Sequence, residues 1–155
     1  MKIFRLILYA VILASLFFAP LKPMKIANLE PIQAVRIHLD GGIVVLETDT
    51  GDKGSGATAE EALRNMKENS TGIIYLDTAQ YLFVSASARE QIPSLQAYLK
   101  ESVRICQWSG QGDISEAVKY AEARKMGLKS REWTEGSNLP ELPPIKQDKY
   151  GKIPS

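Results

Sequence analysis

The sequence from Gly51 to Asp77, GDKGSGATAEEALRNMKENSTGIIYLD, constrains the fold most strongly. Its glycine-rich start is followed by Thr58 and, three residues later, by Glu61, which is the spacing of a capping box at the start of a helix. Apolar residues behind that start recur at the spacing of one helix face: Ala59, Ala62, Leu63 and Met66. This pattern predicts a helix that ends near residues 70–72.

Segments on both sides of this helix alternate between strand and helix patterns. Residues 33–39 and 43–48 flank Asp40-Gly41-Gly42, which predicts a β-hairpin. Further apolar runs predict short strands at residues 73–76, 81–84 and 103–108. The remaining helices are expected in the segment after Pro93, and from the Asp113/Glu116 capping box to Gly127.

This alternation predicts a mixed α/β (α+β) domain, in which about three helices pack on a small mixed β-sheet. The strands at residues 73–76 and 103–108 are apolar enough to be central, and we expect the initial hairpin toward an edge, with one face in water. We divide the chain into an N-terminal hydrophobic helix acting as signal anchor or signal peptide (1–21), a linker (22–32), the domain (33–130) and a polar, proline-rich, extended tail (131–155).

The N-terminal segment has the layout of an export signal. Basic residues within Met1–Arg5 precede an uncharged apolar run, residues 6–21. The run is short for a span of roughly 20 residues, and Pro20 disfavours cleavage after Ala19. We favour an uncleaved signal anchor over a cleaved signal peptide, and a buried core helix is the third alternative. The positive charge before the apolar run predicts that the domain lies on the extracytoplasmic side of the membrane.

Composition excludes several classes of site. The net charge of +1 gives no bulk attraction to nucleic acid or acidic lipid. The only cysteine, Cys106, and the only histidine, His38, cannot supply an internal disulfide or a Cys/His zinc site. We expect no metal and no cofactor. His38 is expected to face solvent and Cys106 to be a buried, inert thiol rather than a catalytic pair.

The glycine-rich stretch imitates a nucleotide site without completing it. Residues 51–58 fit the pattern G-x-x-x-x-G-K-[ST] except that Ala57 stands where the phosphate-binding lysine belongs. We therefore expect Gly54 and Gly56 to form a loop with positive φ before the helix. A weak anion or ligand loop remains the alternative, formed by Gly54, Ser55, Gly56 and Thr58.

Aromatic residues give candidates for partner contacts. Trp108 ends a predicted strand, and Tyr75 and Tyr81 stand at the ends of the strand pair 73–76 and 81–84. Such side chains anchor many protein interfaces. For each of them, a partly buried position at the edge of the core is the alternative.

The order of these segments resembles the N-terminal domain of the Ger(x)C family, the C subunit of spore germinant receptors. The resemblance covers roughly residues 33–127. It rests on the helix start GSGATAEEAL, the segment YLDTAQYLFVS and the segment ASAREQIPSLQAYL that follows it. Positions in register are Thr58, Ala62, the strand 82–84, Ala88, Leu95 and Arg104. Gln80 or Tyr81 stands near the family's His, and Ser or Ala replaces its Glu.

The resemblance implies a non-enzymatic component of spore germination, held at the spore inner membrane and docked onto a membrane-protein partner. The family's members are three-domain lipoproteins, whereas this chain resembles one domain on a signal anchor. The alternative function is an exported protein, either a binder of a small ligand or anion or an enzyme, that uses the Gly51–Thr58 loop.

Overall fold

The computed structural model describes residues 31–145. The predicted signal segment, most of the linker and the last part of the tail lie outside these residues. Within the described range, no helix has the length and hydrophobicity needed to cross a membrane.

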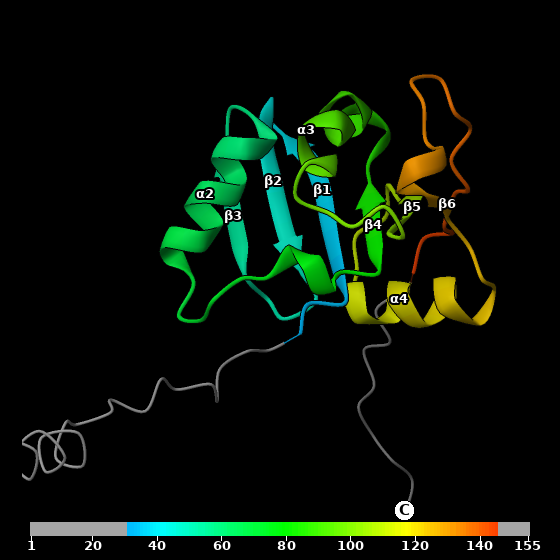
Figure 1. Cartoon of the computed structure of the whole chain (residues 1–155), viewed down its shortest axis with the longest axis horizontal. Coiled ribbons are helices and arrows are strands. Elements are labelled where there is room, and N and C mark those ends of the chain that lie inside the picture. Colours follow the sequence, from blue (N-terminus) through cyan, green and yellow to red (C-terminus); the bar gives the residue numbers. More distant parts are fainter. Residues whose placement is uncertain (1–30, 146–155) are drawn as a thin grey trace, which may run out of the picture.

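The described chain folds around one six-stranded mixed sheet, so the predicted α/β class is confirmed (Figure 1). Its strands are β1 (Ala34–Asp40), β2 (Ile43–Thr48), β3 (Lys53–Gly56), β4 (Tyr81–Val84), β5 (Arg104–Gln107) and β6 (Leu128–Lys129). The α-helices are α2 (Ala59–Asn69), α3 (Ile92–Gln96) and α4 (Ile114–Ala123). Short 3-10 helices are η2 (Leu76–Thr78), η3 (Ala86–Gln91) and η4 (Ser130–Glu132).

The strand order is β3-β2-β1-β4-β5-β6. Strands β1, β4 and β5 are parallel to one another, and the remaining neighbours pair antiparallel. The predicted β1–β2 hairpin is confirmed, but its predicted place at an edge is wrong, because β1 lies between β2 and β4 at the centre of the sheet. The polar face of β1 suggested an edge, yet Arg36 on that face stacks on the Trp108 ring at 4.7 Å.

Alternate side chains of the central strands enter two cores. Leu82 and Val84 of β4 belong to the larger core, together with the apolar faces of α2 and α3. Tyr81 and Phe83 of the same strand belong to the smaller core, under α4. In Figure 1, α4 lies across the lower end of β4 and β5. The sheet is therefore covered on both faces, as the near-continuous apolar sequence of β4 requires.

The predicted helix stripes are confirmed in α2 and α4. Ala59, Ala62, Leu63 and Met66 are all buried, and α2 ends at Asn69, with Ser70 as its C-cap. Asp113 caps α4, but the predicted capping box there is wrong. The Asp113 carboxylate accepts from the Ser115 N–H rather than from the Glu116 N–H, and the Glu116 carboxylate forms an ion pair with Lys119.

The predicted strand at residues 73–76 is wrong. These residues form an irregular segment that leads into η2. Ile74 and Leu76 are buried, whereas Ile73 and Tyr75 are exposed. The apolar run alternates between core and solvent beside the sheet, and it joins no ladder.

The packed part of the chain continues beyond residue 130. Leu139 and Leu142 are buried, and the chain around them bonds to β5. The Gln107 N–H donates to the Pro140 carbonyl at 2.9 Å, and the Leu142 N–H donates to the Gln107 carbonyl at 2.9 Å. Residues 139–142 therefore belong to the domain, although they have the extended conformation expected of the tail.

Candidate functional site

The predicted glycine loop before α2 is wrong, because residues 53–56 form the edge strand β3, antiparallel to β2. Gly54 and Gly56 do not have the expected positive φ; Gly51, with φ +92°, does. A Cβ on Gly54 would overlap the Ala62 carbonyl oxygen and lie 2.5 Å from the Met66 Cβ. These two glycines therefore allow the α2 backbone to approach β3 closely.

The N-terminus of α2 has little capacity left for an anion. The Glu61 N–H donates to the Thr58 hydroxyl at 3.2 Å, and the Glu61 carboxylate accepts from the Ala57 N–H at 2.9 Å. The Ala59 N–H donates to the Gln91 side-chain oxygen at 3.2 Å. Glu60 adds a second carboxylate to the first turn. Carboxylates at the N-terminus of a helix interact favourably with the helix dipole, but they repel a phosphate. Thr58 therefore caps the helix as predicted, although the Glu61 carboxylate bonds to Ala57 rather than to the Thr58 N–H of a capping box, and these bonds stabilise the helix start rather than opening a site.

Cys106 and His38 stand on different strands, β5 and β1, with β4 between them. Burial raises the pKa of the Cys106 thiol to about 12, so the thiol is protonated at neutral pH. Burial and the nearby Arg36 lower the pKa of His38. His38 is partly buried rather than fully solvent-facing, and its Nδ1 has no hydrogen-bond partner in the described structure.

Trp108 and Tyr81 are not exposed contact residues. Trp108 is completely buried, with its ring edge-on to Phe83 at a centroid distance of 5.6 Å. A Cβ on Gly110 would lie 2.7 Å from the Trp108 indole nitrogen, so the chain after β5 folds back tightly over the ring. Tyr81 is only 5% exposed and stacks on Phe83. For both residues, the core is the observed location.

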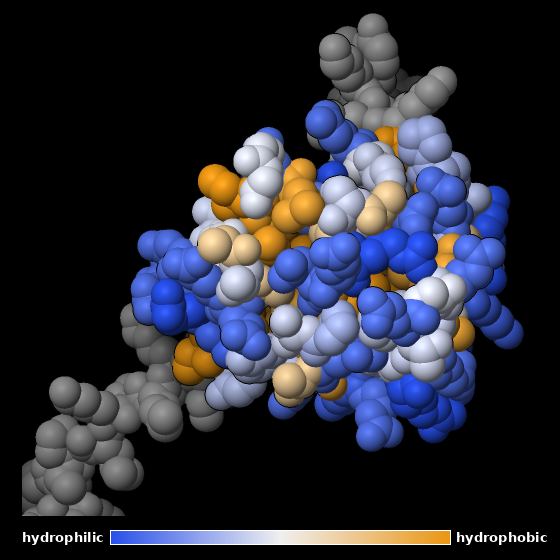
Figure 2. Space-filling model, turned by 90° about the horizontal axis from the view of Figure 1, so that it is seen from above, coloured by the Kyte–Doolittle hydropathy of each residue, from blue (hydrophilic) through white to orange (hydrophobic). Residues whose placement is uncertain are grey.

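Tyr75 does reach the surface. Seen from above, the surface is mainly hydrophilic, and apolar residues reach it in small groups (Figure 2). Within residues 31–145, the large hydrophobic side chains that are exposed are Ile43, Ile73, Tyr75 and Tyr98. Ile73 (62% exposed), Tyr75 (48%) and Tyr98 (40%) line one shallow groove of about 540 Å³. We name it the Tyr75 groove.

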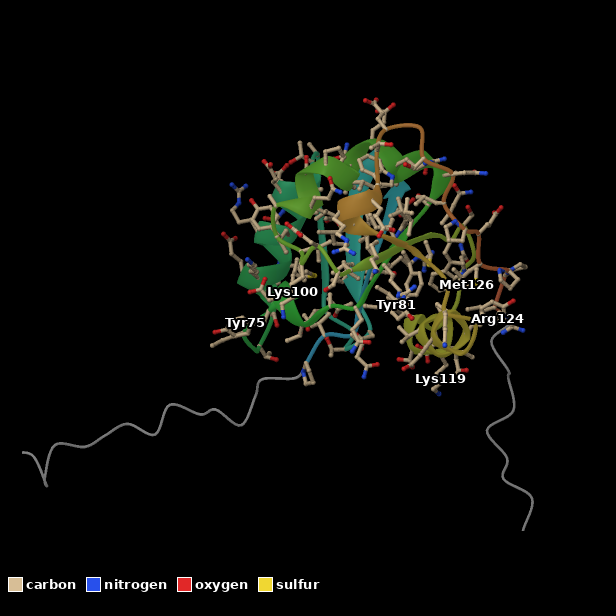
Figure 3. All side chains as sticks on the ribbon, turned by 45° about the vertical axis from the view of Figure 1, so that its right-hand side comes forward. Tyr75, Tyr81, Lys100, Lys119, Arg124 and Met126 are labelled. Atoms are coloured by element: carbon tan, nitrogen blue, oxygen red, sulfur yellow. The ribbon has the colours of Figure 1, made fainter. Side chains whose placement is uncertain are left out.

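The Tyr75 groove combines three parts of the chain. Lys67 comes from the last turn of α2, Ile73 and Tyr75 from the irregular segment, and Tyr98 from the residues after α3. The Lys67 ammonium lies 5.8 Å from the centre of the Tyr98 ring, and Asp77 contributes a carboxylate to the lining. Figure 3 shows Tyr75 extending outward at the lower end of the domain, whereas Tyr81 lies inward near α4.

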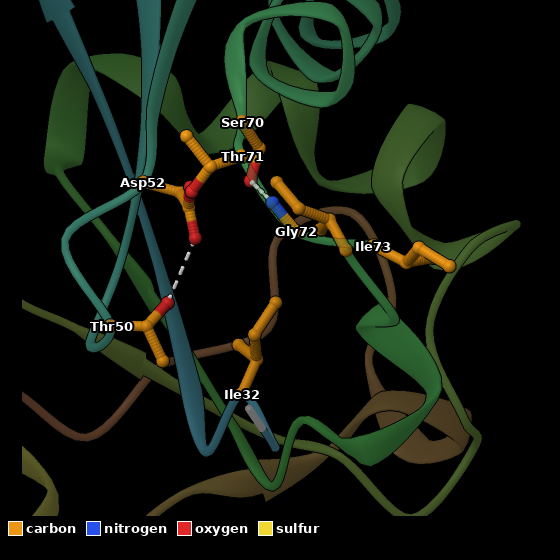
Figure 4. Close-up of a pocket in the computed structure, with 8 residues that line it drawn as sticks. Ile32, Thr50, Asp52, Ser70, Thr71, Gly72 and Ile73 are labelled. Atoms are coloured by element: carbon orange, nitrogen blue, oxygen red, sulfur yellow. Dashed lines mark hydrogen bonds between the residues drawn. The ribbon is translucent and has the colours of Figure 1, made fainter. Parts of the chain in front are cut away.

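A smaller hollow of about 200 Å³ adjoins the groove (Figure 4). Its lining includes Ile32, at the start of the described chain, and the segment Gly72–Ile74, which also lines the Tyr75 groove. Its polar side is closed by internal bonds: Thr50 donates to Asp52 at 3.0 Å, and the Gly72 N–H donates to the Ser70 hydroxyl at 3.2 Å. The place where the chain enters the domain therefore lies next to the groove.

Sequence reasoning found Tyr75 but missed Ile73 and Tyr98. Ile73 was assigned to a buried strand because the run 73–76 is uniformly apolar. Tyr98 falls in the segment after Pro93, for which the sequence predicts a helix. That helix ends at Gln96, so Tyr98 turns outward.

In the described part of the chain, no group of three or more His, Cys, Asp or Glu side chains is arranged to hold a metal ion. Comparisons with family models, with curated proteins and with solved structures found no match.

Proposed function

We propose that this chain is a non-enzymatic, membrane-tethered, extracytoplasmic interaction domain that docks onto a membrane protein through the Tyr75 groove. The observation that carries the proposal is the gathering of Ile73, Tyr75 and Tyr98 in one groove, while the other large apolar side chains of the described domain, apart from Ile43, are at least partly covered. Exposed apolar residues that gather in this way characterise sites of protein contact.

The residue types in the groove suit a protein partner. Two tyrosines supply large, rigid contact area with a polar tip, and tyrosine is among the residues that dominate binding energy at interfaces. The Lys67 and Asp77 side chains place one charge of each sign in the lining. Such charges select a partner and its orientation more than they add affinity.

The biological setting follows from the resemblance to the Ger(x)C family. The resemblance, together with the basic and apolar N-terminal sequence, supports a germination component at the spore inner membrane, with germinant-receptor-like subunits as partners. The helix start at residues 54–63 and the segment 75–99 carry that resemblance. The groove takes Lys67 and residues 72–74 from the sequence between these two parts, and residues 75–77, 97 and 98 from the second part.

The test is co-purification of the anchored chain from sporulating cells, comparing wild type with Ile73→Ser/Tyr75→Ser. The matched control is Ile43→Ser, which removes an exposed isoleucine outside the groove. We expect one membrane protein to co-purify with wild type and with the control, and to be lost with the double variant. The proposal fails if no membrane protein co-purifies, if the double variant retains it, or if the chain is made only in vegetative cells.

A further inference from the structure

The Tyr75 groove is fixed to the point where the chain enters the domain. The Thr78 hydroxyl, just after the groove segment, donates to the Ile32 carbonyl at 3.1 Å. The Gln80 and Tyr81 N–H groups donate to the Gln33 carbonyl at 2.8 and 3.2 Å. These bonds join residues 32–33 to residues 78–81, which directly follow the groove residues Tyr75 and Asp77. The groove cannot move away from the entry point without breaking them.

The entry point is close in sequence to the apolar run. Residues 22–30 separate Leu21 from Pro31. Fully extended, a segment of that length spans at most roughly 30 Å, and as a flexible chain it averages about 17 Å. If residues 6–21 anchor the protein, the groove is held within a short distance of the membrane surface. A partner segment far from the membrane would lie outside that range.

We infer that the groove receives the extracytoplasmic segment of the partner that directly adjoins one of its membrane spans. This inference rests on the proposed function and adds to it which part of the partner is bound. The segment should carry an apolar side chain to cover Ile73 and Tyr75. It should also carry an acidic side chain near Lys67, which forms no ion pair within the described residues.

The alternative occupant of this surface is the lipid bilayer itself, since tyrosine and lysine are also favoured at membrane interfaces. The lining favours a protein. Asp77 stands in the same groove, where a carboxylate would be repelled by anionic headgroups, and the hollowed shape suits an inserted side chain better than a flat membrane surface. The two occupants give different cross-linked products.

The experiment replaces Tyr75 with the photo-cross-linker p-benzoylphenylalanine in the full-length chain, in its native membranes. The control places the same cross-linker at Ile43, the exposed first residue of β2. After irradiation, the adducts are mapped by peptide mass spectrometry. We expect the yield of protein adduct at position 75 to exceed that at position 43 by roughly tenfold. The cross-linked peptide should lie within about ten residues of a membrane span of the partner.

Two results overturn the inference while leaving the proposed function in place. One is an adduct that maps to a part of the partner remote from its membrane spans. The other is equal yields at positions 75 and 43 although the Ile73→Ser/Tyr75→Ser variant loses the partner. A lipid adduct at position 75 without any protein adduct overturns both the inference and the docking role of the groove.

Discussion

Gly54 is buried beneath α2, whereas Tyr75, on the segment that follows the same helix, is about half exposed. Both residues belong to the stretch 51–77, which the sequence presents as one unit. In its first part, residues 53–69, a missing side chain lets the helix backbone approach an edge strand. In its second part, residues 70–77, the side chains of Ile73 and Tyr75 are exposed. The first part determines the fold, and the second presents a surface.

The comparison teaches how neighbouring apolar patterns differ in meaning. The stripe of α2 is buried because a sheet lies opposite to it. Ile73 and Tyr75 have the same apolar character, but no element of the described chain covers them. Burial of an apolar side chain is worth roughly 1.5–3 kcal/mol. That gain remains available to a partner at Ile73 and Tyr75, whereas folding has already used it at Met66.

The largest expected effect comes from a substitution in residues 53–69 that disrupts the packing of α2 on β3. Gly54→Ala introduces a Cβ that overlaps backbone atoms of α2, and we expect the free energy of unfolding to fall by about 3 kcal/mol or more. Denaturant unfolding of the detergent-solubilised full chain, followed by tryptophan fluorescence, measures this. Gly136→Ala is the control: unlike Gly54, Gly136 has a positive φ, and it has open space around it, so a loss of about 1 kcal/mol is expected there. Equal losses at both positions would refute the close-packing explanation.

The second effect comes from substitutions in residues 70–77 that remove the exposed contact residues and leave the fold intact. Ile73→Ser/Tyr75→Ser should change the free energy of unfolding by less than about 0.5 kcal/mol per residue, since both side chains are largely in solvent. The affinity for the membrane partner should fall by at least about tenfold, because the aromatic anchor is lost. Binding of the solubilised chain to the purified partner measures the affinity. Substantial destabilisation by this variant would mean that the segment belongs to the core.

A smaller effect sharpens the role of the α2 start. Thr58→Ala removes the hydroxyl that accepts from the Glu61 N–H, and should cost about 1 kcal/mol of stability. Phosphate affinity should be unchanged from wild type, because the Thr58 hydroxyl caps the helix and binds no anion. Unfolding curves and phosphate titration distinguish the two roles. Unchanged stability with a loss of phosphate binding would restore the anion-loop interpretation.

The smallest effect lies outside both parts, at His38. Its pKa is lowered in the folded state by burial and by Arg36, so protonation opposes folding. The folded state should therefore lose stability as the pH falls below about 6.5, the value for the unfolded chain, and the loss should level off below the folded pKa. In His38→Gln, this part of the pH dependence should disappear. An unchanged slope between pH 7 and 5 would assign it to other groups.

Local signals allowed much of the fold to be predicted. The Thr58 cap, the stripes of α2 and α4 and the Asp40-Gly41-Gly42 turn depend on residues close in sequence, and each is present. The failures concern contacts between distant parts. Whether β1 is central depends on its pairing with β4, and whether Trp108 is buried depends on Arg36 and Gly110 folding over it.

The candidate site was harder to predict for the same reason. A run such as Ile73–Leu76 has equal hydrophobicity whether it pairs in a sheet or lies beside one, so only its surroundings decide which side chains are exposed. Gly54 and Gly56 illustrate the converse error. Glycine permits both a positive φ and the close approach of another backbone segment, and the sequence does not distinguish these two roles. Tyr75 was identified as a contact residue, but the groove around it required the fold.

The central claim is that residues 53–69 determine the fold while residues 70–77 bind the partner. The most direct test measures the free energy of unfolding and the retention of the membrane partner for Gly54→Ala and Ile73→Ser/Tyr75→Ser in parallel. The account predicts that the first variant loses stability, and that the second keeps wild-type stability but loses the partner. Full partner retention by a stable Ile73→Ser/Tyr75→Ser variant would contradict it.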